Sequence, residues 1–211
     1  KRLGAELAKE SHIESDLIIP VPDSGVPAAI GYSEEIKNNY ELGIIRNHYV
    51  GRTFIEPTQQ IRSLGVKLKH NVNKSLIKNK SLILIDDSLV RGTTSVKIIK
   101  MLYEAGAKEI HLRIASPPIK YPDYYGVDTP NQNELLAAKL DLEGMRKFIN
   151  ATTLEFLSLE GLYKSMGYEK RNSSYPQFTD HCFTGEYPVE PVDANSKDFM
   201  DKKISLMSSK S

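Results

Sequence analysis

Short apolar runs alternate with amphipathic stretches along most of the chain. Apolar runs of four to six residues bounded by Pro, Gly or polar residues are typical of buried strands, and apolar positions three or four apart are typical of helices. This pattern predicts helices at 2–11, 26–37 and 94–107, strands at 16–22, 42–45, 81–86 and 110–116, and a further short strand and helix within 154–167.

Strands that alternate with helices indicate an α/β fold, with a mostly parallel twisted sheet and helices on both faces. In such sheets, ligands bind beyond the carboxyl ends of the strands. Two polar segments are expected at such ends, and they are Pro22–Gly25 and Asp86–Ser95.

Two segments depart from this alternation. Residues 46–80 are long and polar between two predicted core strands, and residues 58–68 within them could form a helix. A loop of this length in a compact domain is usually functional. The tail from residue 193 to 211 is rich in Lys, Ser and Asp, and we expect it to be disordered.

Composition narrows the classes of function. The chain has 211 residues, 28 Lys and Arg against 27 Asp and Glu, and a formal net charge of +1, which argues against a basic nucleic-acid-binding surface. No apolar run approaches the length of a membrane span. Cys182 is the only cysteine, which excludes an internal disulfide and indicates a reducing, cytoplasmic setting.

The stretch "LILIDDSLVRGTTS", residues 82–95, carries the most specific chemistry. Asp86 and Asp87 follow a buried strand, and Gly92 with several hydroxyl side chains precedes a helix. The amino end of a helix offers free amides and a positive dipole to an anion, so this loop is a candidate phosphate cradle. It lacks the lysine of a Walker A loop. The two carboxylates suit sugar hydroxyls, Mg²⁺ or a developing positive charge.

A plainer interpretation is that the two aspartates are solvent-exposed residues of a strand–helix turn and have no binding role. For an isolated Asp-Asp pair this interpretation would be favoured. Here the apolar strand, the paired acids and the Gly-Thr-Thr-Ser run coincide, which favours a binding site.

The same stretch resembles the phosphoribosyl pyrophosphate (PRPP) signature of type I phosphoribosyltransferases, in the version found in the glutamine phosphoribosylpyrophosphate amidotransferases. Four further motifs resemble that family in the same order along the chain. They are "VPDSG" (21–25), "NHYVGRTFIEPTQQIR" (47–62), "YYGVDTP" (124–130) and "CFTGEYP" (182–188).

The resemblance implies a domain organisation. Residues 1–150 would form the PRPP-binding domain of type I phosphoribosyltransferase fold, and residues 151–192 an α/β extension packed on it. The glutaminase half of such enzymes uses an amino-terminal cysteine, and nothing in this chain corresponds to it. We therefore expect the chain to be the phosphoribosyltransferase part of a larger enzyme.

The resemblance also implies roles for individual residues. Asp86 and Asp87, with Tyr49 and Arg52, would be catalytic, and Mg²⁺ would be held at Ser24, Asp86 and Asp87. Tyr49, Phe54 and Ile55 would line a path for ammonia, although simple loop packing explains Phe54 and Ile55 equally well. PRPP would be bound by Asp23, Ser24, Asp86, Asp87, Ser88, Val90, Arg91, Gly92, Thr93, Thr94 and Ser95.

The implied reaction is transfer of ammonia, from glutamine in the complete enzyme, to C1 of PRPP. The implied partners are PRPP, ammonia or glutamine, inhibitory purine nucleotides and further copies of the chain in a homo-oligomer, but neither nucleic acid nor a membrane. Ammonia needs no strong general base, and the five histidines are scattered, so we expect them to be surface residues. His48 stands where an arginine is usual in the family, which puts a cationic role there in doubt.

No iron–sulfur cluster is expected, although some family members hold one. The positions of their cluster cysteines are here Asp123, Pro176 and Thr179. Such a cluster normally needs four thiolates, and Cys182 is better explained as a packed small side chain.

Two other functions remain open from the residues alone. One is a salvage phosphoribosyltransferase that uses a free nucleobase, and it would need a hood over the base. The other is a non-enzymatic regulator that senses PRPP, and it should carry a DNA-binding module and a basic face.

Overall fold

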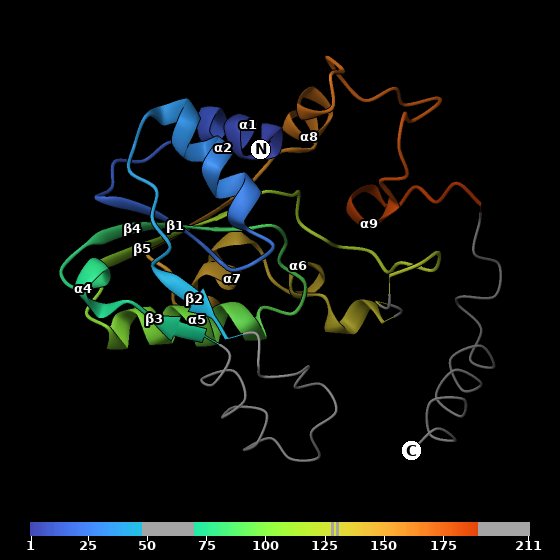
Figure 1. The fold of residues 1–211 in the computed structure, drawn as a ribbon. Helices are drawn as coiled ribbons and strands as arrows, with labels where there is room; N and C mark the ends of the chain where they lie inside the picture. Colours follow the sequence, from blue (N-terminus) through green and yellow to red (C-terminus); the bar gives the residue numbers. More distant parts are fainter. Residues whose placement is uncertain (48–69, 128, 130, 190–211) are drawn as a thin grey trace.

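A four-stranded parallel sheet forms the centre of the molecule (Figure 1). In the computed structural model, which describes residues 1–47, 70–127, 129 and 131–189, the strand order is β1-β4-β5-β6. The strands are β1 (Leu17–Pro20), β4 (Ser81–Asp86), β5 (Glu109–Ile114) and β6 (Thr153–Phe156), and each adjacent pair is parallel. The predicted parallel sheet is confirmed.

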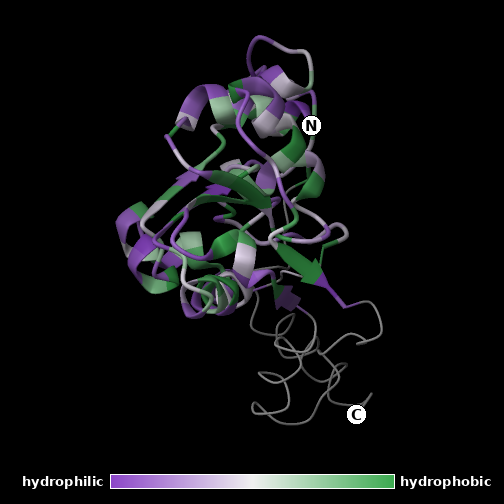
Figure 2. Ribbon diagram, turned by 60° about the vertical axis from the view of Figure 1, so that its left-hand side comes forward, coloured by the Kyte–Doolittle hydropathy of each residue, from purple (hydrophilic) through white to green (hydrophobic). Residues whose placement is uncertain are grey.

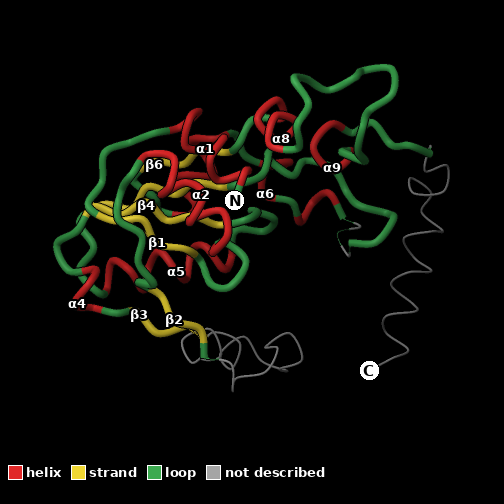
Figure 3. The backbone as a smooth tube through the Cα atoms, turned by 45° about the horizontal axis from the view of Figure 1, so that its top comes forward, coloured by secondary structure: helices red, strands yellow, loops and turns green. Residues whose placement is uncertain are grey.

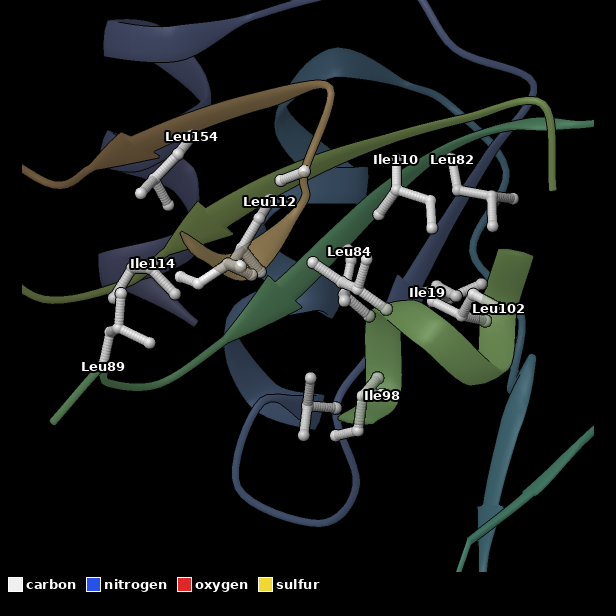
Figure 4. Packing of buried hydrophobic residues seen from close by; sticks show 14 of the residues in the cluster. Ile19, Leu82, Leu84, Leu89, Ile98, Leu102, Ile110, Leu112, Ile114 and Leu154 are labelled. Carbon is white, nitrogen blue, oxygen red and sulfur yellow. The ribbon is translucent and has the colours of Figure 1, made fainter. Parts of the chain in front are cut away.

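The interior strand β4 is buried on both faces because its apolar residues alternate between two cores. Leu82 and Leu84 pack into one core together with Ile98 of α5 (Thr93–Glu104), as Figure 4 shows. Ile83 and Ile85 pack into the second core. A continuous apolar run is what a strand covered on both sides requires.

Helices cover the two faces of the sheet (Figures 1 and 2). Helices α1 (Arg2–Ser11), α2 (Val26–Ile36) and α8 (Leu159–Ser165) pack over one face, where Leu7, Ala28 and Leu162 join the second core. Helices α5 and α7 (Leu142–Ile149) cover the other face. Helices on both faces, as expected from the alternating pattern, are confirmed.

The strand predicted at 42–45 does not belong to the core sheet. Residues Ile44–Arg46 form β2, which pairs antiparallel with β3 (His70–Val72) in a separate two-stranded sheet (Figures 1 and 3). Within β2, Ile44 is buried, whereas Ile45 is 56% exposed and Arg46 is exposed as well. A short apolar run has the same appearance in either setting, so the sequence did not distinguish them.

Smaller elements complete the described chain. They are α4 (Lys74–Ile77), the 3₁₀ turn η2 (Gln132–Glu134), α6 (Leu136–Lys139) and α9 (His181–Thr184). Strand β6 lies within the segment expected as a carboxyl-terminal extension, and it supplies a strand to the main sheet. The helix considered at 58–68 and the tail at 193–211 lie outside the described residues. Of the helices that are described, none is long and apolar enough to span a membrane.

Two glycines set the close crossing of α1 and α2. A side chain on Gly4 would overlap the carbonyl oxygen of Ala28, and one on Gly31 would overlap the carbonyl oxygen of Lys1. Because backbone atoms cannot move aside as side chains do, Gly4→Ala should lower the free energy of unfolding by about 1–3 kcal/mol. Gly126→Ala is the control, since nothing lies within 4 Å of its added carbon. Urea denaturation should show a loss for Gly4→Ala alone, and equal stability of both variants would contradict this account of the crossing.

Candidate active site

The loop between β1 and α2 meets the carboxyl end of β4. The Val21 amide donates a hydrogen bond to the Ile85 carbonyl at 2.8 Å, and the Gly25 amide donates to the Val21 carbonyl at 2.9 Å. A side chain on Gly25 would overlap the Ile85 carbonyl, so this approach requires glycine. Asp23 and Ser24 are exposed at the tip of the loop. The structure therefore brings together the two motifs that the sequence placed at strand ends.

The paired aspartates occupy different environments. Asp86 ends β4 and is only 7% exposed, whereas Asp87 is exposed to solvent. The Asp87 amide donates a hydrogen bond to Asp86 Oδ1 at 2.9 Å. Burial, and then the neighbouring Asp87, raise the pKa of Asp86 well above its ordinary value. The site thus contains one buried acid with a strong affinity for a proton and one carboxyl group in contact with water.

The loop after the aspartates has the form expected of a phosphate cradle. Leu89 is buried in the core below it (Figure 4), which fixes the loop from beneath. Gly92 has a φ of 74° and immediately precedes α5, and no side chain of the described residues caps that helix. Thr93 and Thr94 are exposed, while Ser95 is buried. Uncapped amides and hydroxyls at a helix start form a suitable site for an anion.

Two charged residues near these loops were missed at the sequence level. Arg46 Nη1, at the end of β2, lies 2.7 Å from Asp23 Oδ2. Glu134 accepts a hydrogen bond of 2.7 Å from Arg91 Nε. Arg46 and Glu134 are distant in sequence from Asp23 and Arg91, the residues that they contact. Neither belongs to a recognisable motif, so the sequence alone does not indicate these contacts.

Several predicted residues cannot be placed relative to this site. Tyr49, Arg52, Phe54 and Ile55, together with His48, lie outside the described residues. Ser88 and Val90 are half-buried in the loop that follows Asp87.

The described residues do not by themselves form a complete metal-coordination site. No group of three or more His, Cys, Asp or Glu side chains in the described ranges could hold a metal ion. Mg²⁺ is commonly held by one or two carboxylates together with substrate phosphates and water. Two adjacent carboxyl groups beside an anion site fit that type of binding, with the substrate supplying the remaining oxygens.

The segment around Cys182 is a packed structural cluster. Asp123 accepts a hydrogen bond from the amide of Tyr125 at 2.7 Å and lies 3.0 Å from Nε2 of His181, against which the ring of Tyr125 packs edge-on. Burial, with a smaller contribution from Asp123, raises the pKa of the half-buried Cys182 thiol. The Cys182 carbonyl accepts hydrogen bonds from the amides of Lys120 and Tyr121.

The prediction that the histidines are surface residues is wrong for three of them. His70 of β3 is 9% exposed. His181 is 4% exposed and contacts Asp123, and His111 is 4% exposed and contacts Thr153 and Ser81. Both are buried polar residues with partners, which scattered positions in the sequence do not reveal.

The parallel sheet, with the paired acids and the Gly92 loop at its carboxyl edge, is the arrangement expected of a phosphoribosyltransferase. The model of the phosphoribosyl transferase domain matches residues 1–116, and the chain belongs to that family. The fold is that of the type I phosphoribosyltransferases.

Within that family, the chain is similar to amidophosphoribosyltransferases. It is 56% identical over 210 residues to the amidophosphoribosyltransferase of Rhizobium etli, covering 99% of this chain and 42% of the relative. It is 49% identical over 190 residues to that of Bacillus subtilis, covering 90% of this chain and 40% of the relative.

A solved structure shows the same similarity. The B. subtilis glutamine PRPP amidotransferase complexed with ADP and GMP aligns with a TM-score of 0.80 and 48% identity, covering 90% of this chain and 41% of that one. The chain thus spans about two fifths of the length of the relatives that it matches.

The buried carboxyl group of Asp86 makes stability depend on pH. Because its pKa is raised in the folded state, the fold binds an extra proton between the unfolded and folded pKa values, and stability falls as pH rises through that window. Without metal, Asp86→Asn should therefore unfold at higher urea than the unmodified chain at pH 7, with the gain shrinking towards pH 3. Asp87→Asn should give a smaller gain because Asp87 is exposed. A loss of stability at pH 7 on Asp86→Asn would show that the buried group is ionised and well compensated.

Proposed function

We propose that the chain is the phosphoribosyltransferase part of an amidophosphoribosyltransferase. It attaches ammonia to C1 of PRPP, giving 5-phosphoribosylamine and pyrophosphate, which is the first committed step of purine synthesis. The observation that carries the proposal is the 56% identity, over 99% of this chain, to a relative of that name. The meeting of both predicted loops at the carboxyl end of β4 supports it.

The described residues would divide the binding of PRPP among three groups. The amides and hydroxyls at the start of α5 would hold the 5′-phosphate, since a helix start favours an anion. Asp86 and Asp87 would accept hydrogen bonds from the ribose hydroxyls. The loop that contains Asp23 and Ser24 would face the pyrophosphate, and Arg46 would offset the charge of Asp23 there.

The transfer of ammonia to PRPP would then require little proton transfer by protein side chains. The nitrogen lone pair of ammonia forms a bond to C1 as the bond from C1 to the pyrophosphate oxygen breaks, and the new amine loses a proton to water. Positive charge develops on the ribose ring in between, and the carboxyl pair lies where it would stabilise that charge. Tyr49 and Arg52 belong to this proposal through the family resemblance alone.

Mg²⁺ is the metal that this site would use. Ser24, Asp86 and Asp87 would hold it together with oxygens of the substrate. When bound, it would supply positive charge against the departing pyrophosphate. An iron–sulfur cluster has no place in the proposal, because Cys182 is the only cysteine of the chain.

The whole enzyme would extend this activity. Glutamine would supply the ammonia, purine nucleotides would inhibit, and the protein would work as a homo-oligomer in the cytoplasm. The B. subtilis structure in complex with ADP and GMP supports nucleotides as ligands of this family. The salvage enzyme and the regulator are not favoured, since the relatives are named amidophosphoribosyltransferases at 49–56% identity.

The direct test is release of pyrophosphate from PRPP in the presence of Mg²⁺. The chain should turn over PRPP with ammonium chloride but not with glutamine, because glutamine hydrolysis needs an activated nucleophile that this sequence lacks. The rate should rise with pH, since only unprotonated ammonia attacks.

The matched control is Asp86→Asn combined with Asp87→Asn, which should retain its circular dichroism spectrum and lose turnover. Turnover with glutamine as fast as with ammonium would refute the division of labour. Equal turnover in the double variant would refute the site.

A further inference from the structure

Arg91 lies within the proposed phosphate cradle, yet its side chain is directed to a carboxylate. Its Nε donates to Glu134 Oε2 at 2.7 Å, and its Nη2 lies 2.5 Å from the same oxygen. Glu134 ends the 3₁₀ turn η2, far along the chain from the loop. Two donors on one oxygen fix the direction of the guanidinium plane.

The same downstream region contacts the loop at two more points. The Leu136 amide donates a hydrogen bond of 2.8 Å to the Val90 carbonyl. Atoms of Leu136 and Phe148 lie 2.8 and 3.2 Å from the place that a side chain on Gly92 would occupy. The loop is therefore held at Val90, Arg91 and Gly92 in succession, directly before α5 begins.

The supporting region is itself anchored. Asn131 accepts a hydrogen bond from the Asn133 amide at 2.9 Å, and Gln132 Nε2 donates to the Lys120 carbonyl at 3.0 Å. Leu135 is 1% exposed. Glu134 is thus presented to Arg91 from a fixed backbone.

The Arg91–Glu134 pair is too exposed to serve mainly as a stability device. Their side chains are 45% and 48% exposed, and ion pairs in such positions contribute little to folding. A carboxylate held against an arginine also competes with any phosphate for that arginine. What the pair does fix is the orientation of the turn that presents the first amides of α5.

We propose that Arg91 is a positioning residue, which acts through Glu134 to hold the Val90–Gly92 turn in the shape that binds the 5′-phosphate, and that it does not itself touch the phosphate. This inference rests on the proposed function, since it assigns a role within the PRPP site. It distinguishes Arg91 from Thr93, Thr94 and Ser95, whose amides or hydroxyls would contact the ligand.

The two possible uses of Arg91 predict opposite effects of Glu134→Gln. If the pair positions the turn, loss of the Glu134 charge weakens the restraint on the turn. The KM for PRPP should then rise roughly tenfold with kcat little changed, because a binding contact common to the ground and transition states is weakened. If Arg91 binds the phosphate, removing its competitor should lower the KM. Calorimetric titration of the full chain with PRPP and Mg²⁺ measures the same change as a Kd.

A charge exchange separates the alternatives further. Arg91→Glu combined with Glu134→Arg keeps an ion pair across the same gap and should recover most of the affinity lost in Arg91→Glu. A direct phosphate contact predicts no recovery, because a carboxylate would then face the phosphate. Glu143→Gln is the control, since the exposed ion pairs of Glu143 join it to Arg146 and Lys147 of its own helix α7 and not to a residue of the loop.

The outcomes are distinct. A raised KM in Glu134→Gln, recovery in the exchanged pair and an unchanged Glu143→Gln would support the inference. An unchanged or lower KM in Glu134→Gln, with PRPP still bound by the unmodified chain, would overturn the inference alone. No PRPP binding by the unmodified chain, folded by circular dichroism, would overturn the proposed function and the inference with it.

Discussion

The burial of β4 between two cores is the constraint on which the rest of the structure depends. Its apolar residues alternate between the α5 side and the α1–α2 side, so the strand is fixed in register and direction at the centre of the sheet. Asp86 ends the strand while still buried, and the Val21–Gly25 loop that follows β1 lies beside this strand end. The loop of residues 88–92, which leads into α5, comes directly after the two aspartates. Packing of apolar side chains thus determines where the polar chemistry lies.

That arrangement places a carboxyl group where it destabilises the fold. Asp86 is almost fully buried beside Asp87, and both burial and the adjacent charge oppose its ionisation. Removing water from a carboxylate is unfavourable unless a partner compensates. Under the proposed function, the compensating partners are the ribose hydroxyls and Mg²⁺ of the bound substrate. Stability and binding would then make opposite demands on the same side chain.

Much of the fold could be predicted because its signals are local. The continuous apolar run of β4 and the glycine before α5 show in the sequence, and β4 appears at its predicted bounds. Pairing partners are not local, which is why β2 was assigned to the wrong sheet. The contacts of Arg46 with Asp23 and of Glu134 with Arg91 escaped for the same reason. The folded structure is needed to show which charged residues, distant in sequence, contact the loops at the carboxyl ends of β1 and β4.

Hydrogen exchange with and without PRPP and Mg²⁺ tests the central claim, that the carboxyl edge of β1 and β4 is the substrate site. The account predicts slower exchange in peptides that cover 21–25 and 87–95, because the ligand occupies those amides or restrains their loops. Peptides covering 168–187, around α9, should be unaffected. Protection confined to that carboxyl-terminal region, with the two loops unchanged, would contradict the account.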